Sequence, residues 1–357
     1  MRLPKKYIIP ILLSIQILIL QLLSFFPDAI EKYYSNGLYP KIAWLSRNIL
    51  GSISFSIGDI IYLILVFLAI KWFWRSRKKW KSQWKLQLLS IISAISVFYF
   101  SFTLLWGFNY LRIPLYQKLS IDREYNETEL ETFTLALIHK TNSLQLQLAK
   151  NDTIAVVTPY TLKEIYTQSL PSYQNLELHY SFFKYKNESI KSSLLSLPLS
   201  YMGFSGYLNP FTNEAQVNNR IPKYNLPVTT CHEIAHQIGY ASESEANFIG
   251  FMATIHSTDL YFQYSGYSFA LRHCLNTLEK IKPNSSKKFL PLIHKGVLNN
   301  YSESKLFWEN HQTFLEPFFK IFYDNFLKVN QQKDGMEGYS KFVGLLIGHY
   351  RQTNFEL

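Results

Sequence analysis

Three long apolar stretches in the first third of this 357-residue chain limit its possible folds more than any other feature. They cover residues 7–26, 53–70 and 86–108, and the first and third contain no charged side chain. A helix needs about 20 apolar residues to cross the hydrocarbon core of a bilayer, which is about 30 Å thick. The sequence therefore predicts three transmembrane helices in a membrane domain over residues 1–108. A cleaved signal peptide is the alternative for the first stretch, although no A-x-A site follows it.

Polar and aromatic residues around these stretches fit a membrane location. Asp59 is the one charge inside the second stretch, and we expect it to lie at the membrane interface, with a buried polar role as the alternative. Tryptophan is enriched where lipid meets water. Four tryptophans lie at the edges of the second and third stretches, namely Trp72, Trp74, Trp80 and Trp84.

Basic residues are unevenly distributed along the chain. Up to Arg112 there are 14 Lys and Arg against 3 Asp and Glu, so the net charge of +11 lies in the first third. The rest of the chain is balanced and has no dense basic run, which argues against a nucleic-acid partner. Positive residues gather before residue 7 and over residues 71–85, and both segments are therefore predicted to be cytoplasmic. Three crossings would place everything after residue 108 on the outer side.

The remaining residues, 109–357, are predicted to form a mainly helical domain with a small extended part, an α+β arrangement. Asn126 and Glu129 resemble a capping box at the start of a helix, and a short helix is expected from Thr158. Pro317 is expected to kink or divide a later helix. Further helices are predicted at 227–240, 243–258, 260–281, 303–331 and 338–350, and extended segments at 176–182, 203–208 and 214–220.

The sequence His-Glu-Ile-Ala-His begins at His232. On a helix, residues i and i+4 face the same side, so the imidazoles of His232 and His236 can bind one zinc ion. Glu233 is then the expected general base, the catalytic residue. Pro227 suits the first turn of such a helix and Gly239 suits its end, so the helical context that this chemistry requires is present.

A catalytic zinc ion needs a third protein ligand and an open position for water. Two carboxylates follow the motif, and Glu243 is the preferred ligand, with Glu245 as the alternative. Ser242 and Glu245 fit a capping box, which would give Glu245 a structural task. Asn247 lies one helical turn after Glu243 and is expected to orient a ligand.

Hydrolysis of this kind also needs a group that stabilises the developing oxyanion. A tyrosine or histidine downstream of the motif would serve, with ordinary packing as the alternative for each, and the candidates are Tyr261, Tyr264, Tyr267 and His256.

The chain has two cysteines, Cys231 and Cys274, which either pair with each other or act as small buried apolar residues. Cys231 is not expected to bind the metal. Side chains of neighbouring residues on a helix diverge by about 100°, so it points away from the ligand His232.

Around the motif the sequence resembles the gluzincins, zinc peptidases with an H-E-x-x-H helix and a glutamate from a second helix, often in E-x-x-x-D. Here the second motif reads Glu-Ser-Glu-Ala-Asn from Glu243 to Asn247. Asn247 stands in the place of the aspartate, and only six residues separate His236 from Glu243, fewer than in most gluzincins.

A longer resemblance is to the bacterial family known as domain of unknown function 3810. It rests on residues 106–110, 201–207, 209–212, 232–247 and 264–267. The resemblance implies a multi-pass protein of the bacterial inner (cytoplasmic) membrane, with three transmembrane helices and a zincin-like extracytoplasmic domain. The amino terminus would be cytoplasmic.

These features together predict a membrane-anchored zinc metallopeptidase. Its expected cofactor is Zn²⁺, and its expected partners are the lipid bilayer and a peptide or protein substrate outside the cytoplasm. Two other functions remain open, a non-peptidase zinc hydrolase that acts on envelope material and a catalytically silent, zinc-stabilised scaffold or sensor. Retention of Glu233 argues against the silent protein, because a structural zinc site needs four ligands and no base.

Overall fold

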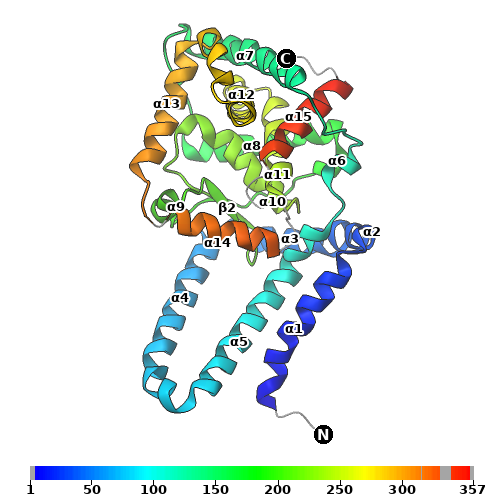
Figure 1. The fold of residues 1–357 in the computed structure, drawn as a ribbon, viewed down its shortest axis with the longest axis vertical. Helices are drawn as coiled ribbons and strands as arrows, with labels where there is room; N and C mark the ends of the chain where they lie inside the picture. The colour runs from blue at the N-terminus through cyan, green and yellow to red at the C-terminus, as the bar shows by residue number, and fades with distance from the viewer. Residues whose placement is uncertain (1–4, 315, 330–338, 354–357) are drawn as a thin grey trace.

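Three long helices extend from one side of a larger helical domain (Figure 1). They are α1 (Lys5–Leu23), α4 (Ile57–Ser76) and α5 (Trp80–Leu105). The structure is a computed structural model, and it describes residues 5–314, 316–329 and 339–353. Within those residues the chain is mainly helical with one small sheet, as the sequence predicts.

Two helical segments of the described chain are long and apolar enough to cross a membrane, Lys6–Leu23 and Ile57–Leu105. The prediction of three separate segments is corrected to two, because helical structure continues through the basic residues between the second and third apolar stretches. The second segment contains α4 and α5, which the short 3-10 helix η2 (Arg77–Lys79) connects. Figure 1 shows that α4 and α5 diverge from this turn as two separate arms.

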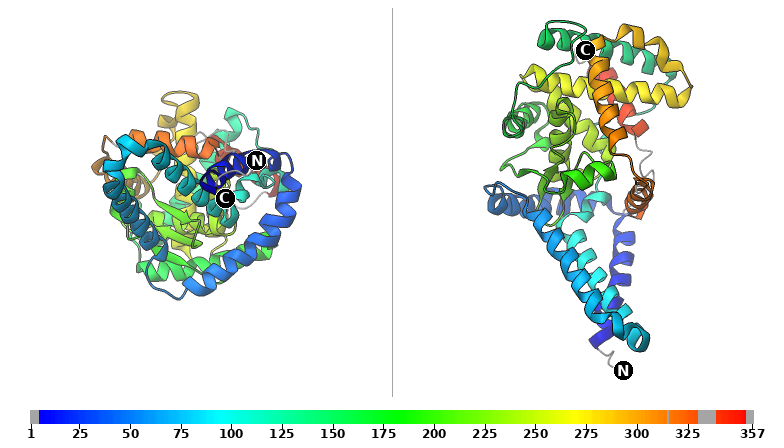
Figure 2. Two further views of the ribbon diagram at one scale, coloured as in Figure 1. Left: turned by 90° about the horizontal axis from the view of Figure 1, so that it is seen from below. Right: turned by 90° about the vertical axis from the view of Figure 1, so that its left-hand side faces the viewer.

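The residues between α1 and α4 form helices that run across the base of the larger domain. They are α2 (Pro27–Ala29), the π-helix η1 (Ile30–Leu38) and α3 (Tyr39–Leu50). Helix α14 (Glu316–Val329) lies at the same level on the opposite side of the molecule (Figure 2). The base of the domain therefore has a helix along each of two sides, next to the ends of α4 and α5.

Asp59 is buried within the protein, so the alternative of a buried polar role is confirmed and exposure to lipid headgroups is not. Its carboxylate is fully buried at the start of α4 and accepts hydrogen bonds from Ser193 Oγ at 2.9 Å, from the Leu194 amide at 2.7 Å and from the Tyr207 hydroxyl. Ser56 Oγ in turn accepts from the Asp59 amide and caps the helix. The negative charge thus fastens α4 to the neighbouring domain, because buried donors satisfy it there.

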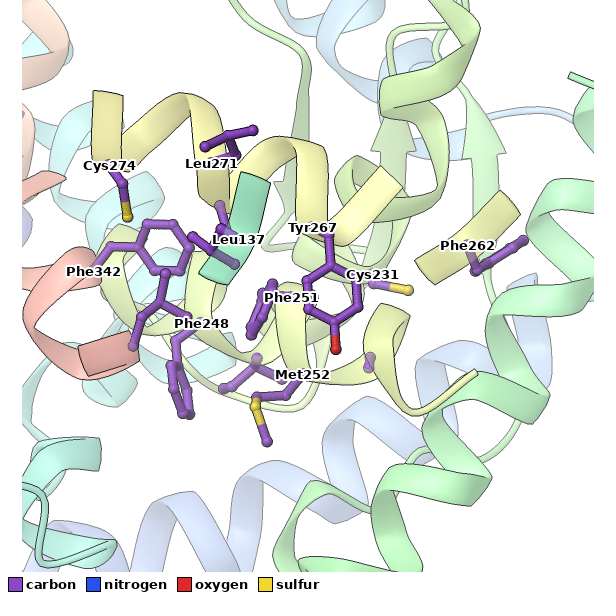
Figure 3. Packing of buried hydrophobic residues seen from close by; sticks show 14 of the residues in the cluster. Leu137, Cys231, Phe248, Phe251, Met252, Phe262, Tyr267, Leu271, Cys274 and Phe342 are labelled. Carbon is purple, nitrogen blue, oxygen red and sulfur yellow. The ribbon is translucent and has the colours of Figure 1, made fainter. Parts of the chain in front are cut away.

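The core of the larger domain lies among helices whose apolar faces pack together. Figure 3 shows Phe251, Leu271 and Phe342, which three of these helices contribute to one buried cluster. The predicted capping box is confirmed, since Asn126 and Glu129 bond each other's backbone amides at the start of α7. The packed helices are α7 (Glu127–Ala149), α8 (Leu162–His179), α10 (Leu226–Gln237), α11 (Glu243–Ile255), α12 (Leu260–Ile281) and α15 (Tyr339–Thr353).

Two local predictions before the sheet fail. Residues 176–182 are not a strand, because α8 continues to His179 and the 3-10 helix η4 (Ser181–Phe183) follows. The buried positions of α8 include Ile165, Ser169 and Leu176, whose spacing fits a helix with one buried face. This helix begins after Thr161 rather than at Thr158, because Thr161 makes the capping box.

The sheet has three strands, β1 (Ile190–Ser192), β2 (Gly206–Asn209) and β3 (Glu214–Val217). Their order is β1-β3-β2, with β1 parallel and β2 antiparallel to β3. The extended segments predicted near 203–208 and 214–220 are therefore confirmed with shorter bounds. Strand β2 lies at an edge of the sheet.

The carboxyl-terminal helices agree with the expected effect of Pro317. The predicted helix over 303–331 is divided into α13 (Lys295–Asn310) and α14, and Pro317 lies in the first turn of α14. Shorter elements complete the described chain, namely α6 (Leu115–Lys118), α9 (Ser196–Met202), η3 (Gly107–Leu111), η5 (Lys223–Asn225), η6 (Ser285–Lys288) and η7 (Leu290–Leu292).

Candidate metal centre

Helix α10 carries the His-Glu-Ile-Ala-His sequence, as predicted. Pro227 lies in its first turn, and Gly239 follows its end with a φ of +92°, which glycine adopts readily. Helix α11 packs closely against α10 at Gly250. A Cβ atom there would lie 2.9 Å from the backbone nitrogen of His232, so only glycine allows this approach.

This packing brings Glu243, at the start of α11, to the two histidines. The Nε2 atoms of His232 and His236 are 3.1 Å apart. Glu243 Oε2 lies 3.3 Å from His232 Nε2 and 3.8 Å from His236 Nε2. The three side chains each offer one ligand atom, all within 4.8 Å of one another, and this donor set fits a zinc ion with an open position.

The ring of His236 is fixed for metal binding. Its Nδ1 lies 2.7 Å from the main-chain oxygen of Tyr240. Because a carbonyl oxygen only accepts, Nδ1 donates its hydrogen, and Nε2 is the nitrogen that faces the cluster. A histidine ligand in proteins usually has such a partner on its other nitrogen.

Charges within the cluster favour a cation. Burial alone would raise the pKa of Glu243, but His232 and His236 lower this pKa well below its usual range. Burial lowers the pKa of His236, yet the neighbouring Glu243 outweighs this effect and raises it to about 9. The carboxylate therefore keeps its negative charge and attracts positive charge to this position.

Glu233 stands beside the cluster without joining it. Burial raises the pKa of its carboxyl group to about 7, against the opposing effect of the two histidines. Its Oε2 is buried and has no hydrogen-bond partner among the described residues. On the other side, a Cβ atom at Gly206 of β2 would lie 2.6 Å from Glu233 Oε1, so β2 passes directly against this carboxylate.

Glu245, the alternative ligand, lies elsewhere. Its Oε1 accepts a hydrogen bond of 2.7 Å from the amide of Leu115, and the side chain is buried. The capping box predicted with Ser242 does not form, because Ser242 precedes α11 without a side-chain cap bond. The carboxylate instead holds the start of α6 against α11. Glu245 is therefore buried by a contact with a distant part of the chain and not by a local helix cap.

The cluster lies in a cavity of about 1180 Å³. Glu233 and Asn247 line this cavity together with the three candidate ligands. Residues 203–208, which include most of β2, form one wall, and residues of α12 form another. The cavity continues to side chains of α4, α5 and α14, namely Tyr62, Phe98, Tyr99, Phe102, Phe319 and Phe322.

None of the four predicted oxyanion-stabilising residues lines the described part of this cavity. The Tyr261 hydroxyl donates to the Lys223 carbonyl, and the Tyr264 hydroxyl donates to Asn300. Tyr267 packs on the core residue Phe251, as Figure 3 shows, and the Nδ1 of His256 bonds a carbonyl of its own helix. These residues have packing or structural roles, the alternative considered for each.

Tyr110 and His273 line the cavity instead. Burial and the charge of Glu243 raise the pKa of Tyr110, and burial lowers the pKa of His273 to about 3, with a further contribution from His232. A neutral phenol and a neutral imidazole therefore stand near the candidate ligands. No local pattern marks His273, because α12 reaches the cluster only through tertiary packing.

The end of α10 is held by residues of α3 and of the segment that follows α5. Trp106 Nε1 donates to the main-chain oxygen of His236 at 3.2 Å, and the Tyr39 hydroxyl donates to that of Gln237 at 2.8 Å. Arg112 Nη1 donates to the oxygen of Gly239 at 2.8 Å. These bonds satisfy the free carbonyl groups at the carboxyl end of the helix.

Arg112 is itself held by a buried ion pair with Glu31 of η1, at 2.8 Å. Burial would raise the pKa of Glu31, but hydrogen bonds and charge from Arg112 and Lys118 lower it to about 2. The helices between the first two apolar stretches thus support the helix that carries both histidines.

Cys231 and Cys274 are both free and buried. Neither belongs to the group of candidate ligands found among the described residues. Of the two alternatives, the structure supports small buried apolar residues.

Comparison with known proteins gives a match to a single family description. The family described as "Protein of unknown function (DUF3810)" matches residues 34–347, which include α3, the sheet and the metal centre. No curated protein and no solved structure matches the chain. Because the match covers most of the sequence, the chain belongs to the DUF3810 family.

Proposed function

We propose that this protein is a membrane-anchored zinc-dependent metallopeptidase with a zincin-like active site. One observation carries the proposal. The ligand atoms of His232, His236 and Glu243 lie within 4.8 Å of one another, while the carboxylate of Glu233 is buried within the same cavity.

The donor set of two imidazoles and one carboxylate fits zinc, and a bound zinc ion would supply Lewis-acid chemistry at this position. Glu233 would accept a proton from the water that attacks the scissile carbonyl. It would then transfer this proton to the departing nitrogen, so that one water yields a carboxylic acid and an amine. A pKa near 7 suits a group that both accepts and donates a proton at neutral pH.

Two neutral groups that line the cavity would stabilise the oxyanion. The Tyr110 hydroxyl and an N–H of His273 are donors in the same cavity as the ligands. Burial favours the uncharged form of both side chains. Each would therefore donate a hydrogen bond to the oxyanion without adding a charge beside the metal ligands.

The sheet edge supplies a means of holding an extended substrate. Strand β2 pairs with β3 on one side only, and Gly206 lies against Glu233. An edge strand can bind a peptide through main-chain hydrogen bonds, which would align a substrate backbone along β2 beside the general base Glu233. This feature favours a peptide over the other hydrolase substrates.

The same geometry weighs against a catalytically silent scaffold. A structural zinc site would use four protein ligands and would need no general base. Here three side chains form the candidate ligand set, and Glu233 beside them is not a ligand but a buried carboxylate whose Oε2 has no hydrogen-bond partner among the described residues. A hydrolase of other envelope material would use the same metal and the same general base. Only its substrate specificity would distinguish it from a peptidase.

For the membrane arrangement, we propose that α1, α4 and α5 each cross the bilayer. The segment around η2 would be cytoplasmic because seven Lys and Arg lie within residues 71–85, and the larger domain would lie outside. Exposed apolar side chains along α4 and α5 support this arrangement.

The purified full-length protein provides the test. We expect about one zinc ion per chain and cleavage of a peptide library, with the cleaved bonds identified by mass spectrometry. Zinc binding with hydrolysis of envelope polymers but of no peptide would replace the peptidase proposal by the second function. Zinc binding with no hydrolysis of either class would favour the scaffold.

A further inference from the structure

The cavity that contains the metal centre also has an aromatic part. It continues between the upper ends of α4 and α5, where Tyr62 and Phe98 belong to its lining. Phe211 contacts both rings, with centroid separations of 6.2 Å to Tyr62 and 4.9 Å to Phe98. The two helices diverge toward the larger domain in Figure 1. Their aromatic side chains Tyr62 and Phe98 line this part of the cavity.

The position of these residues along their helices shows which part of each helix the cavity reaches. Tyr62 is five residues from the start of α4, and Phe98 is seven residues from the end of α5. At 1.5 Å per residue, these positions lie about 8 Å and about 10 Å along the helices from those ends. Asp59, three residues before Tyr62, is buried in the larger domain, so this part of the cavity would lie where α4 and α5 leave the domain and enter one leaflet.

The base of the domain also matches a membrane surface. On one side α3 exposes Trp44, Leu45 and Ile49, and on the other side α14 exposes Phe318 and Ile321. Both helices lie at the level where α4 and α5 enter the domain (Figure 2). Apolar faces of this kind lie in the headgroup region of a bilayer, which would bring lipid to the cavity's lower end.

We propose that the substrate is a peptide that carries a long fatty acyl chain, with the acyl chain between α4 and α5 and the peptide at the metal centre. This inference rests on the proposed peptidase function. The cavity has two connected parts that match the two parts of such a molecule. The aromatic part between α4 and α5 would hold the acyl chain, and the polar part, with the metal ligands and an edge strand, would hold the peptide.

The size of the cavity favours an acyl chain over a membrane-spanning helix. A helix about 30 Å long and about 10 Å wide occupies roughly 2400 Å³. The whole cavity measures about 1180 Å³, part of which belongs to the metal centre. A peptide attached to a transmembrane segment would leave the aromatic part unfilled, because its helix would stay outside.

The first test measures binding without hydrolysis. The full-length Glu233→Gln protein in lipid nanodiscs is photolabelled with a hexapeptide library that carries a diazirine-bearing palmitoyl chain. We expect labels on α4, α5 and Phe211 around the cavity, and diazirine palmitic acid alone should label all lipid-facing surfaces. The same diffuse pattern from both probes would contradict the inference.

A matched pair of variants locates the acyl chain. Phe98→Ser removes a ring that lines the cavity, whereas Phe100→Ser removes a similarly exposed ring, on the same helix, that is not part of the lining. We expect labelling of the cavity to fall about tenfold in the first variant and to be unchanged in the second. Equal loss in both variants would contradict the proposed position.

The second test measures hydrolysis by the wild-type protein. The same library is offered with a palmitoyl group, with an acetyl group, or attached to a transmembrane helix, and the palmitoylated form should be cleaved most efficiently. Equal cleavage of the acetylated form, or preference for the helix-attached form, would contradict the acyl inference while keeping the peptidase. Cavity labelling without any hydrolysis would contradict the peptidase and keep the acyl-peptide site.

Discussion

The indole Nε1 of Trp106 donates a hydrogen bond of 3.2 Å to the main-chain oxygen of His236, so the residue that follows α5 holds a candidate metal ligand. The same indole ring stands edge-on to the imidazole of His236, with centroids 6.2 Å apart. A displacement of α5 would therefore be transmitted to the metal centre through one side chain.

Replacement of this indole tests the connection. In Trp106→Phe the ring contact is largely kept and the hydrogen bond is lost, so the unfolding free energy should fall by about 0.5–1.5 kcal/mol. Chemical denaturation in detergent measures the change. Trp44→Phe, at an exposed position of α3, is the control and should have little effect. An equal loss in both would show that the bond to His236 contributes nothing specific.

The two carboxylates of α11 have separate tasks, and substitution should separate them. Glu243→Ala removes a ligand and should abolish stoichiometric zinc binding. Glu245→Ala leaves the buried Leu115 amide without its acceptor, which should cost about 1–3 kcal/mol of stability while zinc is retained. Metal content and thermal unfolding of both variants are the measurements. Full zinc occupancy in Glu243→Ala would refute the assigned ligand set.

Glu233→Gln should separate catalysis from metal binding. The amide keeps the size of the side chain but cannot accept the proton of the attacking water. Zinc content should be unchanged, and turnover should fall by about 10²–10⁴-fold. Both quantities are measured on one preparation. Unchanged hydrolysis would rule out Glu233 as the base, and simultaneous loss of zinc would indicate a structural role.

The ion pair of Glu31 and Arg112 should make stability depend on acid pH. The folded-state pKa of Glu31, about 2, is below the ordinary value of 4.5, so the pair contributes fully above pH 4.5. Its contribution is lost as the pH falls from 4.5 toward 2. The unfolding midpoint of the wild type should therefore decrease more over this range than that of Glu31→Gln. Parallel pH profiles would contradict the assigned pKa.

Reporter fusions test the membrane arrangement. The segment 71–85 is expected to be cytoplasmic and the carboxyl terminus outside, from the distribution of Lys and Arg. A reporter enzyme that functions only in the cytoplasm should be inactive when fused after Leu357 and active when inserted in the 71–85 segment. The reverse pattern would place the metal centre in the cytoplasm.

Local signals in the sequence were sufficient for much of the fold and for part of the site. The spacing of the two histidines, the capping box at Asn126 and the break at Pro317 each depend on residues within one or two helical turns, and the structure places them as predicted. The strand predicted at 176–182 failed because a short alternation of apolar residues does not distinguish a strand from the end of a helix with one buried face.

The sequence by itself determined that His232 and His236 share a helix face, because 3.6 residues per turn and a four-residue spacing suffice for that. Only the tertiary structure decided the rest of the centre. Glu243 reaches the histidines because α11 approaches α10 at Gly250. Asp59 is buried because the two residues after β1 and Tyr207 of β2 supply its donors. These outcomes depend on contacts between residues far apart in the chain, and no local pattern encodes which buried group will meet which partner.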